Sequence, residues 1–365
     1  MNLTGLPIPP DSEVSMPVTH AALAEATAMR PQASDVHVNE SLPPWLRQGG
    51  RFAPLTGANR SSAREMEAVS AWIGGCSRDS WASALDTVST VAGVDGLRWR
   101  ASCWDGVGGL SASFRLMPQT APPLEQLGLP DEVRMLAAQS SGLVIAAGVA
   151  RSGLTTTLAS LVDLVNSTRE ARILTIEHPV EYLHQPKLSL VSQRDVDPRV
   201  RGSTLRTVLS TDPDVVLVGE CLTAADFELC LALAAAGHLV LTCVHAPDGA
   251  GVCERISAAT GRVGQVLLSQ VLRGVISQRL LPDAADPRGC HVVAEVMLFS
   301  SSMRQWIRPG GEIGRLRTHM ENLQAGLDHA LASKCLQGLV TDHEARCESV
   351  DPETFDLLLR QARAV

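Results

Sequence analysis

The segment from Leu143 to Val165 constrains the fold of this chain more than any other. A short apolar run, Leu143–Ala147, is followed by GVARSGLT and then by residues with a helical pattern. A strand, a glycine-containing loop and a helix in this order are typical of a phosphate-binding loop, where backbone N–H groups and a helix N-terminus surround an anion. The alternative is an ordinary turn between a strand and a helix, and the loop alone leaves both interpretations open.

Most residues of this loop suit anion binding, and one does not. Gly148 and Gly153 permit a tight turn and a close approach of phosphates, and Thr155 supplies a hydroxyl suited to Mg²⁺. Leu154 stands where lysine is expected, and a charge-assisted hydrogen bond contributes roughly 1.5–3 kcal/mol. By analogy with a lost oxyanion donor, we expect catalysis to fall roughly 10²–10³-fold. Arg151 is a candidate surrogate cation, although its side chain starts from a different place.

Further apolar segments downstream end in polar residues. Ile173–Ile176 runs into EHPVE, Val215–Val218 is followed by Gly-Glu, and Leu239–Cys243 lies between two histidines. Catalytic groups gather at the carboxyl ends of strands in open parallel sheets, and a buried strand that projects a carboxylate suits Mg²⁺ or an attacking water. Each histidine alone is more simply a packed or surface residue. Together, the four segments in this order favour a nucleotide site.

Composition and patterning divide the chain into five parts. We expect a flexible N-terminal tail (residues 1–33), an α+β domain (34–116), a linker with four prolines (117–130), an α/β core (131–282) and a mostly helical C-terminal region (283–365). Short apolar runs separated by helices indicate parallel strands with crossovers in the core.

Individual elements follow from the same patterns. In the first domain we expect strands at Asp35–Val38, Leu97–Cys103 and Leu110–Leu116 and a helix at Ser62–Ile73. In the core we expect strands at Leu143–Ala147, Arg172–Ile176, Val215–Val218 and Leu239–Cys243, and helices at Thr155–Val165, Ser203–Ser210 and Ala224–Ala236. Later helices are expected at Val263–Gln278, Met320–Cys335 and Pro352–Arg363.

Charge and cysteine content exclude several protein classes. The net charge of −8 disfavours primary nucleic-acid binding. Nine cysteines without a CxxC pair argue against a zinc ribbon and a disulfide framework, which leaves reduced thiols. No signal peptide is visible at the N-terminus. The apolar stretch Leu229–Ala246 is interrupted by Gly237 and His238, so we interpret it as a buried helix, a turn and a strand, and expect no transmembrane segment.

In this order, the motifs resemble those of the secretion and pilus ATPases of the type II/type IV systems, nearest to the pilus-retraction ATPases PilT and PilU. The Walker A, Asp box, Walker B and His box patterns are matched by GVARSGLT, ILTIEHPVEYLH, DPDVVLVGE and GHLVLTCVHA. SDVHVNESLPPWLRQGG, LRWRASCWDGVGGLSASFRLMP, LRGVISQRLL and SMRQWIRPG resemble further family segments. The resemblance covers about residues 34–343. It implies an α/β, RecA-like P-loop NTPase core with a parallel sheet, preceded by a smaller α+β (PAS-like) domain and followed by C-terminal helices.

The resemblance also implies roles for the matching residues. Gly148, Ser152, Gly153 and Thr155, with Leu154 among them, would hold the phosphates of ATP and a Mg²⁺ ion. Glu177 and Glu181 match Asp-box acids, Glu220 matches the Walker B acid that orients water, and His238 and His245 match the His box that senses the γ-phosphate. Arg98, Arg100 and Arg115 match N-terminal arginines that reach the nucleotide.

Several positions depart from the family pattern and leave two functions open. Besides Leu154, His178 replaces an acid, Cys221–Thr223 replace Met-Arg-Asp, and Arg151 stands where glycine is usual. One function is a subunit of a homo- or hetero-hexamer with family members, which binds nucleotide with impaired or absent hydrolysis and supports pilus retraction or secretion. The alternative is an active hexameric ATPase motor for twitching motility or for protein or DNA secretion. In both cases we expect a cytoplasmic protein that reaches the inner membrane through a platform protein and binds no nucleic acid directly.

Overall fold

The computed structural model describes residues 16–363 apart from 30–32, 49–50, 76–81, 83–84, 93–96, 199–200, 202–203, 205–207, 209 and 287–288. Its contacts divide the chain into two compact units. The first contains Met1–Thr120 with Pro179–Leu183, and the second contains Ala121–His178 with His184–Val365. The division at Thr120 lies inside the proline-rich segment 117–130.

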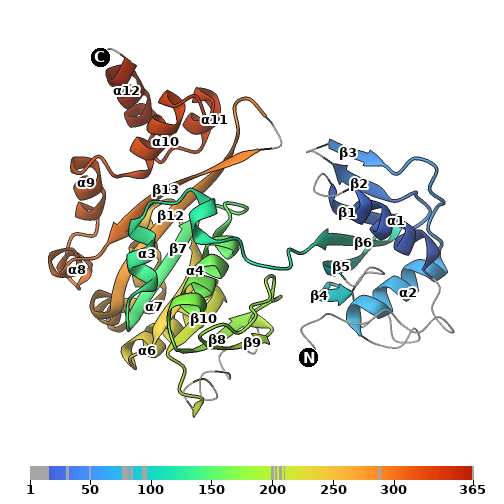
Figure 1. The fold of residues 1–365 in the computed structure, drawn as a ribbon, viewed down its shortest axis with the longest axis horizontal. Helices are drawn as coiled ribbons and strands as arrows, with labels where there is room; N and C mark the ends of the chain where they lie inside the picture. The colour runs from blue at the N-terminus through green and yellow to red at the C-terminus, as the bar shows by residue number, and fades with distance from the viewer. Residues whose placement is uncertain are drawn as a thin grey trace. The chain divides into compact units, whose positions relative to one another are not determined.

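The first unit is an antiparallel sheet with helices on it (Figure 1). Its strands, in the spatial order β3-β2-β1-β6-β5-β4, are β1 (Ala33–Asn39), β2 (Trp45–Gln48), β3 (Arg51–Pro54), β4 (Thr87–Ala92), β5 (Arg98–Gly106) and β6 (Gly109–Leu116). Helices α1 (Pro17–Ala28) and α2 (Ala63–Gly74) contribute to its core. Trp99 and Phe114 of the sheet are buried with Met66 and Trp72 of α2.

Helix α1 occupies a segment that the sequence predicts as a flexible tail. The buried residues Ala22 and Leu23 belong to the core of the first unit, and both the backbone N–H and the hydroxyl of Thr19 donate to Oε1 of Glu65, at 2.8 and 3.0 Å. The prediction is therefore wrong for Pro17–Ala28. Two of its four buried residues are alanine and one is threonine, so its sequence carries little of the contrast that marks an amphipathic helix. The remainder of the predicted tail before Met16 lies outside the described residues.

The second unit contains a seven-stranded sheet in the order β13-β12-β7-β11-β10-β8-β9. The strands are β7 (Gly142–Gly148), β8 (Arg172–Glu177), β9 (Leu190–Asp195), β10 (Val215–Glu220), β11 (Leu239–His245), β12 (Leu272–Pro282) and β13 (Cys290–Leu298). All neighbouring pairs are parallel except β12 with β13, which is antiparallel. The parallel α/β core predicted from the sequence is confirmed.

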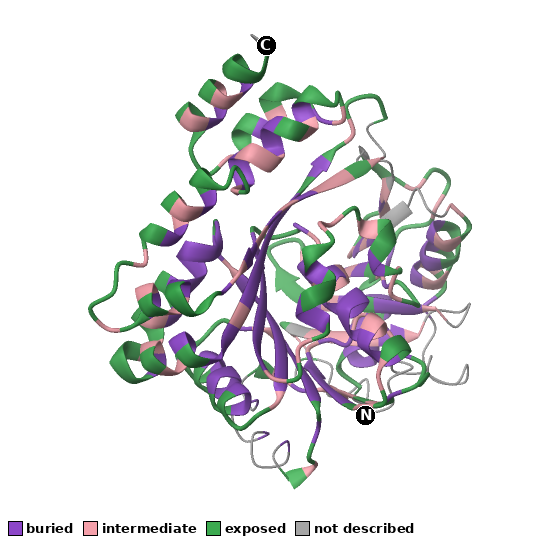
Figure 2. Ribbon diagram, turned by 60° about the vertical axis from the view of Figure 1, so that its left-hand side comes forward, coloured by how far each residue is buried: buried purple, intermediate pink, exposed green. Residues whose placement is uncertain are grey.

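Helices cover both faces of this sheet. The 3₁₀ helix η2 (Leu124–Leu127), α3 (Glu132–Ala137) and α4 (Leu154–Thr168) cover one face, and α6 (Ala224–Ala235), α7 (Gly249–Val271), α8 (Ser301–Ile307) and α9 (Arg315–Asn322) cover the other. Strand β7 alternates between them: Leu143 and Ile145 belong to the cluster with α6 and α7, and Val144 and Ala146 to the cluster with α4. The inner strands of this sheet are almost entirely buried (Figure 2), whereas the edge strands β9 and β13 are partly exposed.

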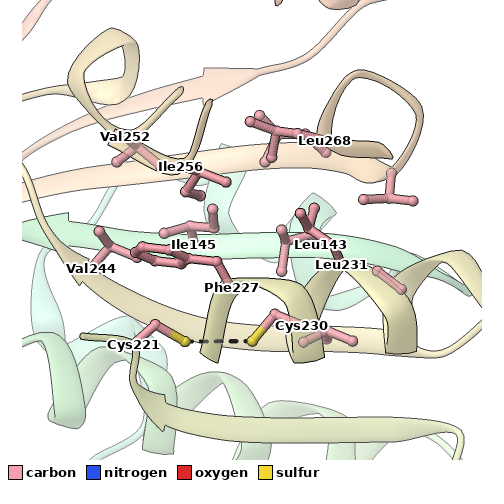
Figure 3. Close-up of a cluster of buried hydrophobic side chains, with 14 of the residues drawn as sticks. Leu143, Ile145, Cys221, Phe227, Cys230, Leu231, Val244, Val252, Ile256 and Leu268 are labelled. Atoms are coloured by element: carbon pink, nitrogen blue, oxygen red, sulfur yellow. Dashed lines mark hydrogen bonds between the residues drawn. The ribbon is translucent and has the colours of Figure 1, made fainter. Parts of the chain in front are cut away.

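The cluster between the sheet and helices α6 and α7 is drawn in Figure 3. Phe227 of α6 and Ile256 of α7 lie over Ile145 of β7. The sulfur atoms of Cys221 and Cys230 are 3.5 Å apart in the same cluster, and both are free thiols. The eight cysteines within the described segments are all free thiols.

The C-terminal part departs from the predicted helices in two places. The expected helix Val263–Gln278 is wrong after Val271, because Leu272–Pro282 is strand β12. A buried parallel strand is a continuous apolar run, which periodicity alone cannot distinguish from a helix. The expected helix Met320–Cys335 is two helices, α9 and α10 (Leu327–Leu336), separated at Gln324, which has a left-handed φ of 51°.

The remaining C-terminal helices are α11 (Asp342–Cys347) and α12 (Pro352–Arg363), and they form a separate small core with α10. Strand β13 lies in the region expected to be mostly helical. The predicted helix Ser203–Ser210 falls largely outside the described residues. Within the part of the chain that the structure describes, no helix combines the length and apolarity needed to span a bilayer.

Candidate nucleotide-binding site

The predicted phosphate-binding loop connects the carboxyl end of β7 to the first turn of α4. Arg151 and Gly153 both have left-handed backbones, with φ of 70° and 84°. Helix α4 begins at Leu154, and no side chain caps its N-terminus. The first N–H groups of a helix have no partner within the helix and lie at the positive end of its dipole. The loop therefore offers donors and a favourable potential to an anion.

The rear of the loop is held closely against strand β12. Gly148 is paired with Gln278 in the β7–β12 register. A Cβ atom on Gly148 would come 2.6 Å from the carbonyl oxygen of Gln278 and would also collide with the Ser152 hydroxyl, so only glycine fits there. The Ser152 hydroxyl donates to the Val149 carbonyl at 2.7 Å. A hydrogen bond between two of its own residues thus stabilises the conformation of the loop.

Leu154 places an apolar side chain at the lysine position. It is 7% exposed and belongs to a buried cluster that also contains Leu158 of α4 and Cys243 of β11. Its side chain therefore contributes to packing between helix and sheet and supplies no charge to the loop. Thr155, the second residue of α4, is half-buried, and Arg151 is exposed.

Glu220 and His245 lie together beside the loop. The His245 Nε2 atom is 2.8 Å from Glu220 Oε1, and its Nδ1 atom is 3.0 Å from the carbonyl oxygen of Gly148. A carbonyl and a carboxylate only accept hydrogen bonds, so both bonds form together when the ring carries two N–H groups. Strand β11 lies between β7 and β10. The predicted Walker B acid is thereby linked through one histidine to the first glycine of the loop.

Glu177 ends the strand on the far side of β10. Its side chain is largely buried, and Gln193 Nε2 lies 3.5 Å from its Oε1 atom. Strand β8 is three strand spacings from β7, or on the order of 14 Å. The next residue, His178, contacts Asp195 of β9 through Nδ1 at 2.7 Å. The histidine that departs from the family pattern is therefore paired with a carboxylate.

His238 is not brought to this site. It precedes β11, whereas His245 ends it, so the two lie about 23 Å apart along the strand. The His238 Nδ1 atom is 2.6 Å from the carbonyl oxygen of Pro213. His238 therefore lies at the amino end of β11, away from the Gly148–Thr155 loop, and its assignment to the catalytic set stays a prediction.

The other predicted residues lie in the first unit. Arg98 is buried and donates to the backbone carbonyls of Val180, at 2.7 Å, and Glu181. Arg100 lies 3.6 Å from the Glu181 carboxylate, and Arg115 lies 2.6 Å from Asp35. Burial raises the pKa of Glu181, and the three arginines oppose this shift. The geometry brings Glu181 together with Arg98 and Arg100, and their assignment to a nucleotide remains a prediction.

Three further residues contact the site and were not among the predicted ones. Arg201 is buried and donates to the Glu220 carbonyl at 2.8 Å and to Asp226 at 3.1 Å. Arg255 donates to the His245 carbonyl at 2.7 Å. The third is Gln278, which is fully buried. A polar amide inside the apolar segment LRGVISQRLLP is the sequence signal that could have indicated it.

The described residues contain no group of three or more His, Cys, Asp or Glu side chains arranged to hold a metal ion. A Mg²⁺ ion in nucleotide sites shares its coordination between protein oxygens and phosphates. Thr155 at the start of α4 therefore remains the predicted protein ligand.

The chain is similar to pilus ATPases over most of its length. It is 33% identical over 268 residues to a "Twitching motility protein" of Neisseria gonorrhoeae, covering 71% of each chain. It is 29% identical over 337 residues to the "Type IV pilus retractation ATPase PilT" of Pseudomonas aeruginosa, covering 88% of this chain and 96% of that one.

Its fold is likewise similar to a solved structure of this type. The crystal structure of the pilus retraction motor PilT with bound ADP superposes with a TM-score of 0.82 at 29% identity, covering 93% of this chain and 98% of that chain. The family described as "Type II/IV secretion system protein" matches residues 95–347. With more than half of the chain matched and the predicted parallel core observed, this chain belongs to the type II/IV secretion system protein family and is similar to its PilT and PilU pilus ATPases.

Proposed function

We propose that this chain is a nucleotide-binding ring subunit of a type IV pilus or secretion machine in which ATP hydrolysis is impaired or absent. One observation carries the proposal: the loop keeps the backbone of an anion site while Leu154 is buried in an apolar cluster at the lysine position. Backbone N–H groups and a helix dipole support binding of phosphate. Stabilisation of charge that develops during phosphoryl transfer requires a cation that this position does not supply.

The residues present would fit the phosphates of a nucleoside di- or triphosphate. Gly148 and Gly153 leave both ends of the loop without a Cβ atom, and the uncapped start of α4 offers donors. Ser152 and Thr155 complete the segment that would hold the phosphates and Mg²⁺. When bound, the nucleotide supplies the anhydride bond whose cleavage drives motion in motors of this kind. PilT is described as a retraction motor with bound ADP, which supports ADP as the first ligand to test.

An active motor is the second candidate, and one observation favours it. Glu220 contacts His245, and His245 in turn contacts the carbonyl of Gly148. Such a carboxylate can orient an attacking water when the phosphates are positioned well. In this case the missing lysine would have to be replaced by Arg151 or by an arginine of a neighbouring subunit.

Steady-state turnover of Mg²⁺-ATP separates the two candidates. We expect the wild-type protein to show little turnover and L154K to raise it by roughly 10²–10³-fold, since the lysine charge is restored beside an intact Glu220. L154Q is the matched control, because it introduces a polar side chain of similar length without charge. Turnover by the wild type that L154K fails to increase would show an active motor and contradict impaired hydrolysis.

Assembly with family members is part of the same proposal. We propose a homo- or hetero-hexamer in which Arg98, Arg100 or Arg115 reaches a nucleotide, held at the cytoplasmic face of the inner membrane by a platform protein. Native mass spectrometry of this chain mixed with an active PilT-type ATPase tests the ring. Mixed six-membered species support a hetero-hexamer, and only separate species of each chain contradict it.

A further inference from the structure

We infer that Gln278 is a positioning residue for the phosphate-binding loop: it holds the Ser152 carbonyl against the sheet and thereby turns the Gly153 N–H toward the ligand. This inference rests on the proposed function, because the ligand is taken to be a nucleotide phosphate. It assigns a role in binding to a residue that contacts only protein.

The side chain of Gln278 connects the phosphate-binding loop to helix α4. Its Nε2 atom donates to the Ser152 carbonyl at 2.6 Å, and its Oε1 atom accepts from the Thr157 hydroxyl at 2.9 Å. Ser152 belongs to the loop, and Thr157 lies in the first turns of α4. Strand β12, the loop and α4 are therefore fixed to one another by a single amide group.

The contacts also fix which way the amide group faces. A carbonyl oxygen only accepts, so the amide nitrogen must face Ser152 and the amide oxygen must face Thr157. Gln278 and Thr157 are both fully or almost fully buried, at 0% and 1% exposed. A buried polar group left without a partner costs roughly 1–3 kcal/mol. The arrangement is therefore strongly preferred over one in which the side chain turns away.

Peptide geometry connects this contact to the ligand. The Ser152 carbonyl and the Gly153 N–H belong to one planar trans peptide group and point in opposite directions. Because the carbonyl is directed at Gln278 inside the protein, the N–H is directed away from it. Gly153 also approaches Gln278 closely, since a Cβ atom there would lie 3.3 Å from Nε2. Loss of the Gln278 contact frees this peptide group to rotate and removes a donor from the loop.

The absence of lysine makes this contact more important in this chain. With Leu154 at the lysine position, the loop itself supplies no cation there, so backbone donors and the dipole of α4 would contribute more of the attraction for phosphate. The orientation of each N–H group then accounts for a larger share of the affinity. A residue that sets one of these orientations should affect binding about as strongly as a direct contact.

The test compares ADP affinity and loop protection in the full-length chain. Q278E keeps the acceptor for Thr157 and loses the donor to Ser152, and Q278M keeps the length and loses both. We expect each to weaken ADP binding about tenfold, the equivalent of one hydrogen bond. S277A is the matched control, because Ser277 is a fully buried neighbour on β12 whose hydroxyl has no hydrogen-bond partner. It should leave ADP affinity unchanged.

A second variant distinguishes positioning from general stability. T157V removes the other partner of the amide, so we expect it to weaken ADP binding less than Q278M does. The T157V/Q278M double variant should be no weaker than Q278M alone, because both changes act through one contact. Additive losses, or folded Q278E and Q278M proteins that bind ADP as tightly as the wild type, would overturn the inference.

Hydrogen exchange in the nucleotide-free protein separates this inference from the proposed function. The Ser152 and Thr157 amides donate to the carbonyls of Val149 and Gly153. We expect these two amides to exchange faster in Q278E and Q278M and at the wild-type rate in S277A. If the wild type binds no ADP, the proposed function fails, and this exchange comparison still decides whether Gln278 holds the loop. Unchanged exchange in Q278E and Q278M would overturn the inference.

Discussion

At the scale of single residues, the loop combines an unusual backbone with an unusual side chain. Arg151 is one of five non-glycine residues in the described segments that have positive φ. The left-handed conformation costs an L-residue roughly 1–2 kcal/mol. Arginine is thus kept in a conformation that favours glycine, next to a loop in which Leu154 removes the expected cation. Compared with the family pattern, the loop gains a positive charge at Arg151 and lacks one at Leu154, while its backbone is still that of an anion site.

The strain at Arg151 predicts the effect of its replacement. R151G should raise the free energy of unfolding by about 1 kcal/mol, since relief of the left-handed strain exceeds the added freedom of glycine in the unfolded chain. R151A keeps the strain and removes the charge, so it should change stability by less than about 0.5 kcal/mol. Urea denaturation measures both. Equal stability of the two variants would show that Arg151 is not strained.

Glu295 of β13 predicts a pH dependence of stability. Its side chain is buried, and burial and the nearby carboxylate of Asp248 raise its pKa to about 7, opposed by N–H donors from Gly249 and Leu327. The unfolded chain loses this proton near the ordinary pKa of 4.5, so between about 4.5 and 7 the folded state binds more protons. Stability should therefore fall as pH rises through this window, by on the order of 3 kcal/mol in total.

E295Q isolates this effect, because glutamine resembles the protonated acid at every pH. Urea midpoints measured from pH 4.5 to 8 should show the wild type losing stability relative to E295Q as pH rises, on top of a constant offset for the backbone N–H group from which the glutamine nitrogen cannot accept. A difference between the two proteins that stays constant with pH would contradict the shifted pKa.

At the scale of elements, the sequence predicted the strands and helices that carry the loop and missed those with weak or ambiguous patterns. Strands β7, β8, β10 and β11 and helices α4 and α6 were predicted nearly to their bounds, because each is bordered by turns and by a change of periodicity. Helix α1 was missed because alanine supplies little contrast. Strand β12, which carries Gln278, was taken for a helix because a buried strand is apolar on both faces.

Part of the candidate site could be predicted from the order of strands alone. Residues at the carboxyl ends of β7, β10 and β11 come together, because parallel strands end at one edge of the sheet. The sequence already predicted His238 and His245 at opposite ends of the strand Leu239–Cys243, so the assignment of His238 rests on the family resemblance alone and stays a prediction. Arg201 and Arg255 donate to backbone carbonyls, and such contacts leave no motif, whereas Gln278 is marked in the sequence only as a polar residue inside an apolar segment.

The docking of α1 predicts a stability effect in the first unit. L23A should lower the free energy of unfolding by roughly 2–5 kcal/mol, because Leu23 is 1% exposed in the core and its truncation leaves a cavity. E25A, on the exposed face of the same helix, should change it by less than about 0.5 kcal/mol. Tryptophan fluorescence in urea reports mainly on this unit, since five of the six tryptophans precede Thr120. Equal effects of the two variants would show that α1 is not part of the core.

At the scale of the whole molecule, the fold is similar to that of PilT over 93% of this chain. The departures from the family pattern at Arg151, Leu154, His178 and Cys221–Thr223 are changes of side chain within that fold. A ring built from such subunits would keep the contacts that bind nucleotide and transmit motion while contributing less hydrolysis. The proposed function requires that the loop bind nucleotide without its lysine.

Calorimetric titration of ADP into the wild-type protein tests most directly whether the loop binds nucleotide without a lysine. We expect saturable binding of one ADP per chain, and we expect it to be lost in G148A, where a Cβ would meet the Gln278 carbonyl at 2.6 Å. No heat of binding in the wild type at millimolar ADP, or equal binding by G148A, would contradict a nucleotide site at this loop.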